Sequence, residues 1–513
     1  MKSKSLRPAT ISIVLAIFAA VVAAAKAPQA SPHAKPGTQT KPAATPLHNK
    51  AKLADITARL EQDVPRLMKE ADVPGLSIAL LRDGELAWHH GFGVMNSRTK
   101  EPVTDITVFE AASLSKPVCA YAVLKLADAG KLDLDKPLNQ YLPGDYDVGP
   151  DARLGQITAR RVLNHTTGFP NWRAEPVLKI FFTPGEKFSY SGEGFVYLSK
   201  AIEQITGEKF NDFMKRTVFD PLGMTNSSYV WQSSYDTQKI GRHNMVGEPT
   251  PQNKPDKANA AASLHTTAQD YARFIAAILK GTGLKKETVR QMLTPQIQVD
   301  EAGANMTARP ANNLSPTVWW GLGVGLQKTP EGISFWHWGD NGDTKAFFVA
   351  FQEQKIGMVV FTNSANGLSF MPELVDEAIG GQQPALAWIK PESYKSPSRI
   401  LIKNILARGG EAALREYRQW RAGRPESEVI NENQMNRLGY TLIGMKRVKD
   451  AIEVFKLNVE DYPQSSNTYD SLGEGYMIDG NKELAIKNYE RSIELDPKNT
   501  NGIASLKKLR EAK

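Results

Sequence analysis

Four pairs of residues near the end of this chain recur 34 positions apart, and this regularity restricts the possible fold more than any other feature. The pairs are Leu438-Gly439 with Leu472-Gly473, Ala451 with Ala485, Phe455 with Tyr489, and Pro463 with Pro497. A fixed period of about 20–50 residues is typical of a repeat architecture, in which similar units stack on one another. The chain of 513 residues therefore contains a small repeat module after a much longer segment of different pattern.

The residues that recur at this period resemble the tetratricopeptide repeat, a helix–turn–helix unit with small residues where its helices touch and proline at its end. The resemblance covers residues 432–499 as two repeats, with 500–513 as a capping helix. Two repeats are few for such an array, so residues 397–424, which have helical periodicity, are expected to add buried surface. The resemblance implies a protein or peptide partner, bound near Tyr440 and Tyr476. The alternative is that the array only packs on the preceding domain.

The net charge of +8 comes entirely from residues 1–52, which contain eight Lys and Arg residues and no Asp or Glu. The rest of the chain is therefore balanced. A protein that binds nucleic acid non-specifically needs a basic face on its folded part. Composition thus argues against a nucleic-acid partner.

The N-terminus has the pattern of an export signal. Three basic residues among the first seven precede an apolar run, which ends in alanines at residues 23–25. We expect residues 1–25 to be a cleaved signal peptide, residues 26–52 a flexible Ala/Pro/Lys linker, and the mature protein to be periplasmic or secreted. The alternative is an uncleaved membrane anchor, because residues 9–25 are just long enough to cross a bilayer.

The segment between the linker and the repeats has the pattern of a mixed α+β domain. Helical periodicity is found over residues 56–68, 114–129, 194–206 and 268–280. Apolar strands are predicted at 76–81 and 86–93, joined by the hairpin dipeptide Asp83-Gly84, and at 333–336, 346–351 and 357–362. Strands at both ends with helices between them predict one antiparallel sheet whose first and last strands are neighbours.

Several kinds of site are excluded by missing motifs. The sequence has no Gly-x-x-x-x-Gly-Lys-Ser/Thr phosphate loop, no His-Glu-x-x-His and only one cysteine, Cys119. We therefore expect no cofactor, no metal and no disulfide bond within the chain. Cys119, inside an apolar helix, is expected to be a small core residue.

With those sites excluded, nucleophilic catalysis is the chemistry that the sequence still allows, and Ser113 is the best candidate for the nucleophile. The pattern Ser-x-x-Lys occurs three times, but only at residues 113–116 does it follow a turn of small residues and begin a long apolar helix. Pro117 agrees with a helix start, where proline is tolerated. Residues three positions apart share a helix face, so a desolvated Lys116 amine could take the Ser113 proton. The alternative is that Ser113 is only a helix N-cap.

Two further segments support the catalytic interpretation. Residues 184–192, Pro-Gly-Glu-Lys-Phe-Ser-Tyr-Ser-Gly, place Tyr190 before a helix, and residues 336–339, Trp-His-Trp-Gly, end a strand. Together with Ser-Leu-Ser-Lys at 113–116, they resemble the three motifs of the serine β-lactamase and penicillin-binding superfamily, in the same order. The resemblance covers residues 55–385 and is to the class C-like branch, which includes β-lactamases, D-alanyl-D-alanine carboxypeptidases, D-aminopeptidases and esterases.

The resemblance implies a fold and a domain order. We expect a β-lactamase-like antiparallel sheet flanked by helices, plus an all-helical domain, over residues 53–385. A helical linker over 386–431 and the α-helical repeats over 432–513 would follow. Because all three motifs lie before the repeats, residues after about Pro391 are expected to be removable without loss of hydrolysis.

The resemblance also implies a role for each motif residue. Ser113 would attack a carbonyl carbon, and Lys116 and Tyr190 would relay its proton; which of the two is the base for acylation stays open. The backbone N–H groups of Ser113 and Asp340 would form the oxyanion hole. His337 stands where relatives have lysine and would orient the Tyr190 side and the substrate, with a charge that depends on pH.

Departures from the family motifs narrow the expected substrate. Gly192 stands where many relatives have asparagine, which removes an amide that contacts the acyl side chain of β-lactams. Trp338 and Asp340, on either side of Gly339, replace hydroxyl residues that hold a substrate carboxylate, and Asp340 is expected to repel one. Trp172 is expected to line the mouth of the site, with a surface-packing tryptophan as the alternative.

Two other segments are given structural interpretations. His165 is expected to be a buried, hydrogen-bonded turn residue rather than a catalyst. The polar stretch 241–258 is expected to be a surface loop over the mouth of the site.

Together these patterns predict an exported serine hydrolase that cleaves an ester, amide or peptide bond in a small molecule through an acyl-enzyme, with the repeats recruiting a partner. The nearest alternative is a β-lactamase or D-alanyl-D-alanine carboxypeptidase. An alternative of another class is a binding protein whose lapsed hydrolase domain is a scaffold for the repeats. The intact residues Ser113, Lys116 and Tyr190 favour the enzyme.

Overall fold

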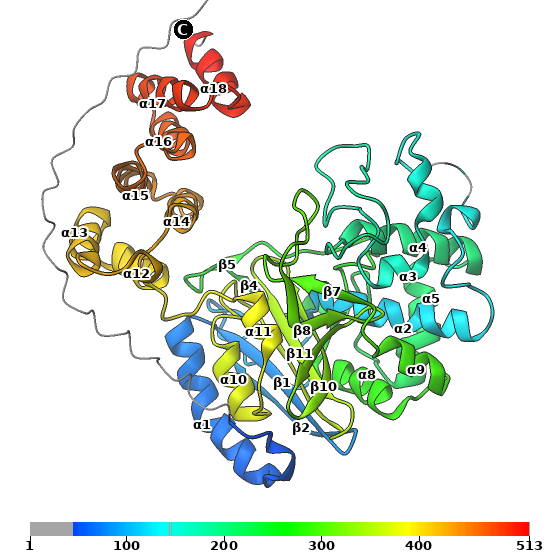
Figure 1. Ribbon diagram of the computed structural model, residues 1–513. Helices are drawn as coiled ribbons and strands as arrows, with labels where there is room; N and C mark the ends of the chain where they lie inside the picture. Colours follow the sequence, from blue (N-terminus) through cyan, green and yellow to red (C-terminus); the bar gives the residue numbers. More distant parts are fainter. Residues whose placement is uncertain (1–44, 143, 145, 512–513) are drawn as a thin grey trace, which may run out of the picture. The chain divides into compact units, whose positions relative to one another are not determined.

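The computed structural model describes residues 45–142, 144 and 146–511, so the expected signal peptide lies outside it. Within these residues, eight antiparallel strands form one sheet in the order β2-β1-β12-β11-β10-β9-β8-β7 (Figure 1). They are β1 (Gly75–Arg82), β2 (Glu85–Gly93), β7 (Ile297–Asp300), β8 (Leu314–Trp320), β9 (Gly325–Thr329), β10 (Gly332–Asp340), β11 (Lys345–Phe351) and β12 (Ile356–Thr362). Two short ladders join β3 (Phe109–Glu110) to β6 (His265–Thr266) and β4 (Arg242–His243) to β5 (Pro249–Thr250).

The first and last strands of the sheet domain are neighbours, as the sequence predicts. Ile78 in β1 lies opposite Val360 in β12. β1 and β2 are joined at Asp83 and Gly84, whose φ angles are 52° and 74°. Positive φ at both central residues is what a tight two-residue hairpin requires. β10, β11 and β12 form the predicted antiparallel meander.

Side chains of the sheet alternate between two faces, and each face has its own hydrophobic core. Ile78 and Val349 belong to the first core, together with the helices on that face. These helices are α1 (Leu53–Ala71), α10 (Met371–Ala378) and α11 (Pro384–Ile389). Ala79 and Phe348 point the other way, into the second core.

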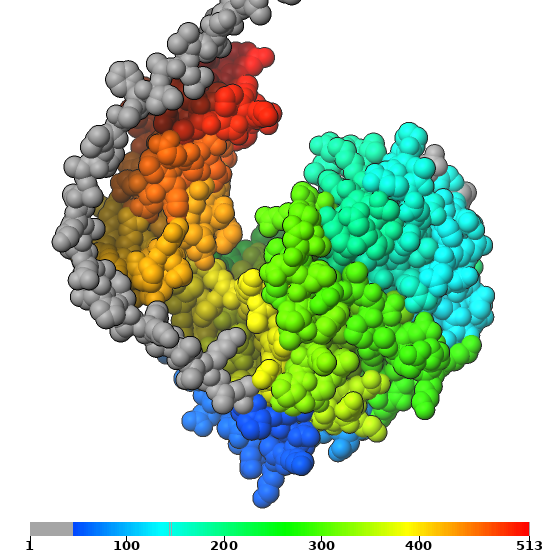
Figure 2. All heavy atoms as spheres, in the orientation of Figure 1, coloured from blue at the N-terminus to red at the C-terminus, as the bar shows by residue number. Residues whose placement is uncertain are grey.

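The second core joins the sheet to a group of helices. These helices are α2 (Ser115–Asp128), α3 (Ala159–Leu163), α4 (Gly192–Thr206), α5 (Phe210–Met214), α6 (Asp220–Leu222), α7 (Tyr235–Gln238), α8 (Ala268–Lys280) and α9 (Lys286–Met292). In the space-filling view, the cyan and green segments that contain α2–α9 form a continuous surface with the strands (Figure 2). The mixed α+β fold predicted from the sequence is therefore confirmed.

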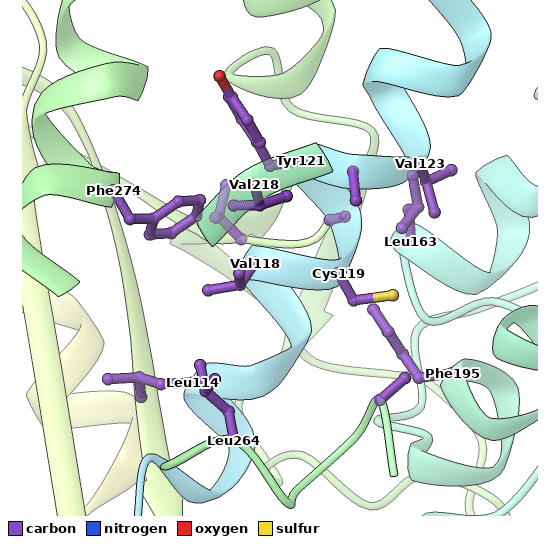
Figure 3. Packing of buried hydrophobic residues seen from close by; sticks show 14 of the residues in the cluster. Leu114, Val118, Cys119, Tyr121, Val123, Leu163, Phe195, Val218, Leu264 and Phe274 are labelled. Atoms are coloured by element: carbon purple, nitrogen blue, oxygen red, sulfur yellow. The ribbon is translucent and has the colours of Figure 1, made fainter. Parts of the chain in front are cut away.

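Helix α2 passes through the middle of the second core. Val118, Cys119 and Tyr121 are fully buried, and Figure 3 shows them among side chains from other helices, including Phe195 and Phe274. Burial raises the pKa of the Cys119 thiol. The interpretation of Cys119 as a small core residue is confirmed.

Both ends of the sheet domain extend beyond the expected limits. The N–H of His48 donates to the carbonyl of Ile379 (2.8 Å), and Leu47 packs against the first core, so the folded region begins before residue 53. Tyr394 is also part of that core, and its N–H donates to the carbonyl of Ser369 (3.3 Å). A cut at Pro391 would remove this buried ring, so a truncated fragment should keep the chain up to Tyr394.

The C-terminal part of the described chain is helical. Its helices are α12 (Pro397–Arg408), α13 (Gly410–Arg421), α14 (Glu432–Gly444), α15 (Val448–Asp461), α16 (Ser466–Ile478), α17 (Lys482–Leu495) and α18 (Thr500–Glu511). The 34-residue period has a physical cause within each helical hairpin. A Cβ added at Gly439 would come 2.2 Å from the ring of Phe455, and one at Gly473 would come 3.2 Å from the ring of Tyr489. Glycine therefore lets the two helices of a hairpin approach closely.

The hairpin of α12 and α13 shares a hydrophobic core with the first repeat. Leu401 and Tyr417 pack in one cluster with Leu438 and Phe455. Residues 397–424 thus add buried surface to the array, as their periodicity predicts. None of the helices in residues 45–511 that the structure describes is both long and apolar enough to cross a bilayer.

Candidate active site

Ser113 lies in a tight turn at the start of α2. The short 3₁₀ helix η2 (Ala112–Leu114) carries it directly into α2. Ala112 has a φ of 48°, a left-handed conformation that costs a residue with a Cβ about 1 kcal/mol or more. This strained residue immediately precedes the serine, which is partly exposed although most of its neighbours in the turn are buried. The turn therefore presents the Ser113 hydroxyl at the surface of a rigid core.

The amine of Lys116 is within hydrogen-bond distance of Ser113. Lys116 Nζ lies 3.0 Å from Ser113 Oγ and donates to the carbonyl of Ala261 at 2.8 Å. The side chain is completely buried, and this burial lowers the pKa of the amine from 10.5 to about 7. A large fraction of Lys116 is therefore neutral near pH 7 and can accept a proton.

Tyr190 completes the group of three expected catalytic side chains. Its ring centroid lies 4.7 Å from Lys116 Nζ. Its hydroxyl makes no hydrogen bond of ordinary length with any described residue, but it interacts with the Ser113 hydroxyl. Burial raises the pKa of Tyr190 well above its usual value, and the interaction with Ser113 offsets only part of this increase. Tyr190 is therefore a neutral phenol.

His165 holds Tyr190 in position, a role that sequence reasoning missed. Its ring stacks on the Tyr190 ring with 4.3 Å between centroids. His165 Nδ1 accepts the N–H of Ser191 at 2.9 Å, and burial keeps the pKa of the imidazole well below its usual value. The expected buried, hydrogen-bonded turn residue is confirmed, including a φ of 57° that fits a turn. Only the fold brings its ring against Tyr190.

The end of strand β10 closes the site from the other side. Its pairing with β9 stops at Trp336, and its pairing with β11 continues to Asp340. A Cβ at Gly339 would come 2.6 Å from the carbonyl oxygen of Ala111 and 3.2 Å from the Cβ of Ala112. Only glycine therefore allows β10 to lie this close to the turn that carries the serine.

His337 is neutral in this structure, which corrects the expected pH-dependent charge. Its Nδ1–H donates to the carbonyl of Trp338 at 2.7 Å, and its Nε2 is buried without a partner in the described residues. Complete burial, aided by the nearby Lys116, lowers the pKa of His337 to about 3. His337 therefore cannot replace the positive charge of a lysine. It presents a hydrogen-bond acceptor instead.

The carboxylate of Asp340 is compensated locally. It accepts the N–H of Gly342 at 2.8 Å and pairs with the Lys345 amine. The repulsion of a substrate carboxylate expected for this residue is correspondingly weaker.

Trp172 occupies space that a side chain at position 192 would need. A Cβ at Gly192 would come 2.9 Å from the Trp172 ring and 2.7 Å from the carbonyl oxygen of Asn171. The Trp172 ring centroid lies 6.0 Å from Lys116 Nζ, and 47% of the residue is exposed. Trp172 is thus near the buried amine and is also partly open to solvent.

A buried ionic group beside the site was not found from the sequence. Glu110 binds Lys239 (2.9 Å) and accepts from the Asn341 amide (3.1 Å), and the guanidinium of Arg242 is 3.7 Å away. Burial alone would raise the pKa of Glu110, but Lys239 and Arg242 hold it below its usual value. These residues are too far apart in sequence for spacing to predict their contact.

Comparisons with known proteins agree with the motifs. The beta-lactamase family model matches residues 60–378, and the tetratricopeptide repeat model matches residues 466–499, the second expected repeat. Penicillin-binding protein 4 of Amycolatopsis lactamdurans is 25% identical over 66% of this chain and 93% of its own length. Penicillin-binding protein 4* of Bacillus subtilis is 30% identical, but over only 31% of this chain and 39% of its own length.

Two solved structures share the fold. A class C beta-lactamase mutant has a TM-score of 0.55 and 18% identity, covering 63% of this chain and 97% of that one. A D-alanine carboxypeptidase from Burkholderia cenocepacia has a TM-score of 0.54 and 18% identity, covering 64% of this chain and 99% of that one. At this identity the likeness concerns the fold alone.

Proposed function

The chain belongs to the beta-lactamase family, and from that premise we propose that it is a serine hydrolase that cleaves an ester or amide bond in a small molecule through an acyl-enzyme on Ser113. One observation supports the proposal most strongly. A completely buried lysine amine with a pKa of about 7 lies 3.0 Å from the hydroxyl of a partly exposed serine. A lysine kept uncharged in this way can activate a serine, whose hydroxyl is otherwise a weak nucleophile.

We assign the base of the acylation step to Lys116 and not to Tyr190. The same burial makes the amine a base near pH 7 and makes the phenolate of Tyr190 unfavourable. As Ser113 Oγ bonds to the substrate carbonyl carbon, its proton passes to Lys116 Nζ and the carbonyl electron pair moves onto oxygen. The N–H groups of Ser113 and Asp340 would bind this oxyanion.

Collapse of the tetrahedral intermediate breaks the bond to the leaving group. Tyr190 donates its proton to the leaving oxygen or nitrogen and recovers one from the Lys116 ammonium. In deacylation, water attacks the acyl carbon, and its proton passes to Lys116 through Tyr190. The acid product leaves as Ser113 Oγ regains a proton. His337 stays neutral throughout and can accept a hydrogen bond through Nε2.

The residues around this centre favour esters or simple amides over β-lactams and D-alanyl-D-alanine peptides. Trp338 and Asp340 offer no hydroxyl where relatives hold a substrate carboxylate. Trp172 fills the space above Gly192, so no side-chain amide reaches the site from that position. The contact between Lys116 and Ser113, with the Tyr190 ring beside the amine, also argues against a lapsed hydrolase that is only a scaffold.

The chain itself provides matched controls for testing the nucleophile. A fluorophosphonate probe should form one covalent adduct with the wild-type protein, measured by intact mass, and none with Ser113→Ala. Ser97 and Ser505 also stand three residues before a lysine, so Ser97→Ala and Ser505→Ala should still be labelled. A fluorescent penicillin tested in parallel should label weakly. Equal fluorophosphonate labelling of Ser113→Ala would refute the assignment.

We further propose that the protein is exported to the periplasm or secreted, and that its repeats recruit a protein or peptide partner. The basic and apolar pattern of residues 1–25 supports export. N-terminal sequencing of the mature protein should then begin near residue 26. The match of residues 466–499 to a repeat family supports recruitment.

A further inference from the structure

A cavity of about 340 Å³ lies beside the proposed catalytic residues. Its walls include Trp172, Arg242, Lys257, Asn259, Ala262 and Asn341. Two of these residues adjoin the catalytic centre directly in the chain. Ala262 follows Ala261, whose carbonyl accepts from the Lys116 amine, and Asn341 follows Asp340. The cavity is therefore next to the reacting carbonyl.

The chemical surroundings of the cavity identify which part of a substrate would enter it. The leaving group must depart beside Tyr190, which protonates it in the proposed mechanism. Neither Tyr190 nor its neighbours His337 and Trp338 are among the described residues that line the cavity. Because residues next to Ala261 and Asp340 line the cavity, we assign it to the acyl part of the substrate, which bonds to Ser113 in acylation and leaves it in deacylation.

The cavity wall carries an excess of positive charge. Glu110 is the one acidic residue among the described residues that line it, and Lys239 already pairs with it at 2.9 Å. Arg242 is a second cation that shares this one carboxylate, because its Nε forms a longer ion pair with Glu110 at 3.7 Å without a hydrogen bond. Lys257, which is exposed, adds a third at the rim.

Among the described residues, the Arg242 side chain makes only one hydrogen bond. A guanidinium has five N–H donors. One of them, on Nη2, binds the carbonyl of Asn341 at 2.6 Å, which holds the side chain at the cavity wall. Its Nε is buried and has no acceptor among the described residues. Such a planar, anchored group with free donors suits a carboxylate, which can accept two parallel hydrogen bonds.

We propose that this cavity is an acyl subsite selective for anions, in which Arg242 binds a carboxylate on the acyl part of the substrate. The inference rests on the proposed hydrolase function and specifies its substrate class. The ring of Trp172 forms an apolar wall along which the carbon chain between carbonyl and carboxylate would lie. This site is separate from positions 338 and 340, where relatives bind a carboxylate through hydroxyl groups.

The test compares two esters that differ only in charge. One is the 4-nitrophenyl monoester of hexanedioic acid, and the other is its methyl ester, which has the same chain without the carboxylate. The wild-type enzyme should have a kcat/KM at least about tenfold higher for the acid, the scale of a charge-assisted hydrogen bond. Raising the ionic strength to about 1 M should reduce this ratio, because salt screens partly exposed charges.

Variants of Arg242 and of a control lysine assign the preference to one side chain. Arg242→Gln should bring the ratio of the two kcat/KM values to about 1, and Arg242→Lys should keep part of it. Lys254, which is exposed and paired with Asp236, is a matched control, and Lys254→Gln should keep the full ratio. A ratio in Arg242→Gln equal to that of the wild type would overturn the inference, as would a wild-type preference for the methyl ester.

Ser113→Ala, measured with both esters, separates this inference from the proposed function. If hydrolysis depends on Ser113 but the ester with the free carboxylate is not preferred over its methyl ester, the anionic subsite is refuted and the hydrolase proposal stands. Hydrolysis that persists in Ser113→Ala, or no hydrolysis of either ester by the wild type, overturns both.

Discussion

Replacing Lys116 by methionine should abolish hydrolysis and yet stabilise the fold near neutral pH. Burial lowers the pKa of this amine from 10.5 to about 7. Near pH 7 the amine is fully charged in the unfolded chain, whereas in the folded protein it must either lose its proton or be buried with its charge. A pKa difference of this size corresponds to about 4 kcal/mol of lost stability at pH 7. Losing the hydrogen bond to Ala261 costs about 1 kcal/mol. The net expected gain for Lys116→Met is about 3 kcal/mol.

The difference in stability between Lys116→Met and the wild type should depend on pH. Between about pH 7 and 10.5 the unfolded chain binds more protons at Lys116 than the folded protein does. The stability of the wild type should therefore rise with pH across this window, while Lys116→Met lacks this contribution. The advantage of the variant should be greatest at pH 7 or below and should shrink toward pH 10.5.

Urea unfolding at pH 7, 8.5 and 10, followed by far-UV circular dichroism, measures this difference. Lys131, exposed just after α2, is the control, and Lys131→Met should follow the wild type at each pH. A Lys116→Met protein that is less stable than the wild type at pH 7, or a difference that does not change with pH, would show that the amine is not held neutral by burial.

Four further outcomes are expected. Tyr190→Phe should lower kcat by at least about 10²-fold, the scale of a lost proton-transfer partner; unchanged turnover would remove Tyr190 from the relay. The kcat/KM for a neutral ester should fall about tenfold per pH unit below pH 7 as Lys116 becomes protonated, and a flat profile from pH 5 to 8 would contradict this assignment. Uncharged short esters should be hydrolysed with higher kcat/KM than any cephalosporin, and the opposite order would show that the missing hydroxyl groups do not matter. A fragment that ends just after Tyr394 should keep ester hydrolysis, because it keeps both hydrophobic cores of the sheet domain; the contacts that it loses include the Lys403–Asp72 ion pair and the hydrogen bond from Arg399 to Asn366. An unfolded or inactive fragment would make the repeats part of the catalytic domain.

Much of the fold could be predicted from the sequence because its signals are local. The turn at Asp83-Gly84, the helical period over 268–280 and the 34-residue recurrence each depend on residues that are close in the chain. The juxtaposition of Ser113 and Lys116 is also local, because residues three positions apart share a helix face. Tyr190 and the end of β10 could be assigned only through a resemblance to a known family, since no local rule places them beside α2.

The sequence by itself determined the class of fold, the repeat module and the candidate residues for acyl transfer. The tertiary structure alone decided how those residues behave. Burial makes Lys116 a base and keeps His337 neutral, and burial depends on segments that pack together from distant parts of the chain. The same packing puts Trp172 over Gly192 and anchors Arg242 beside Asn341. Contacts between residues this far apart in the chain produce no periodic pattern in the sequence, because they depend on how the formed helices and strands pack together.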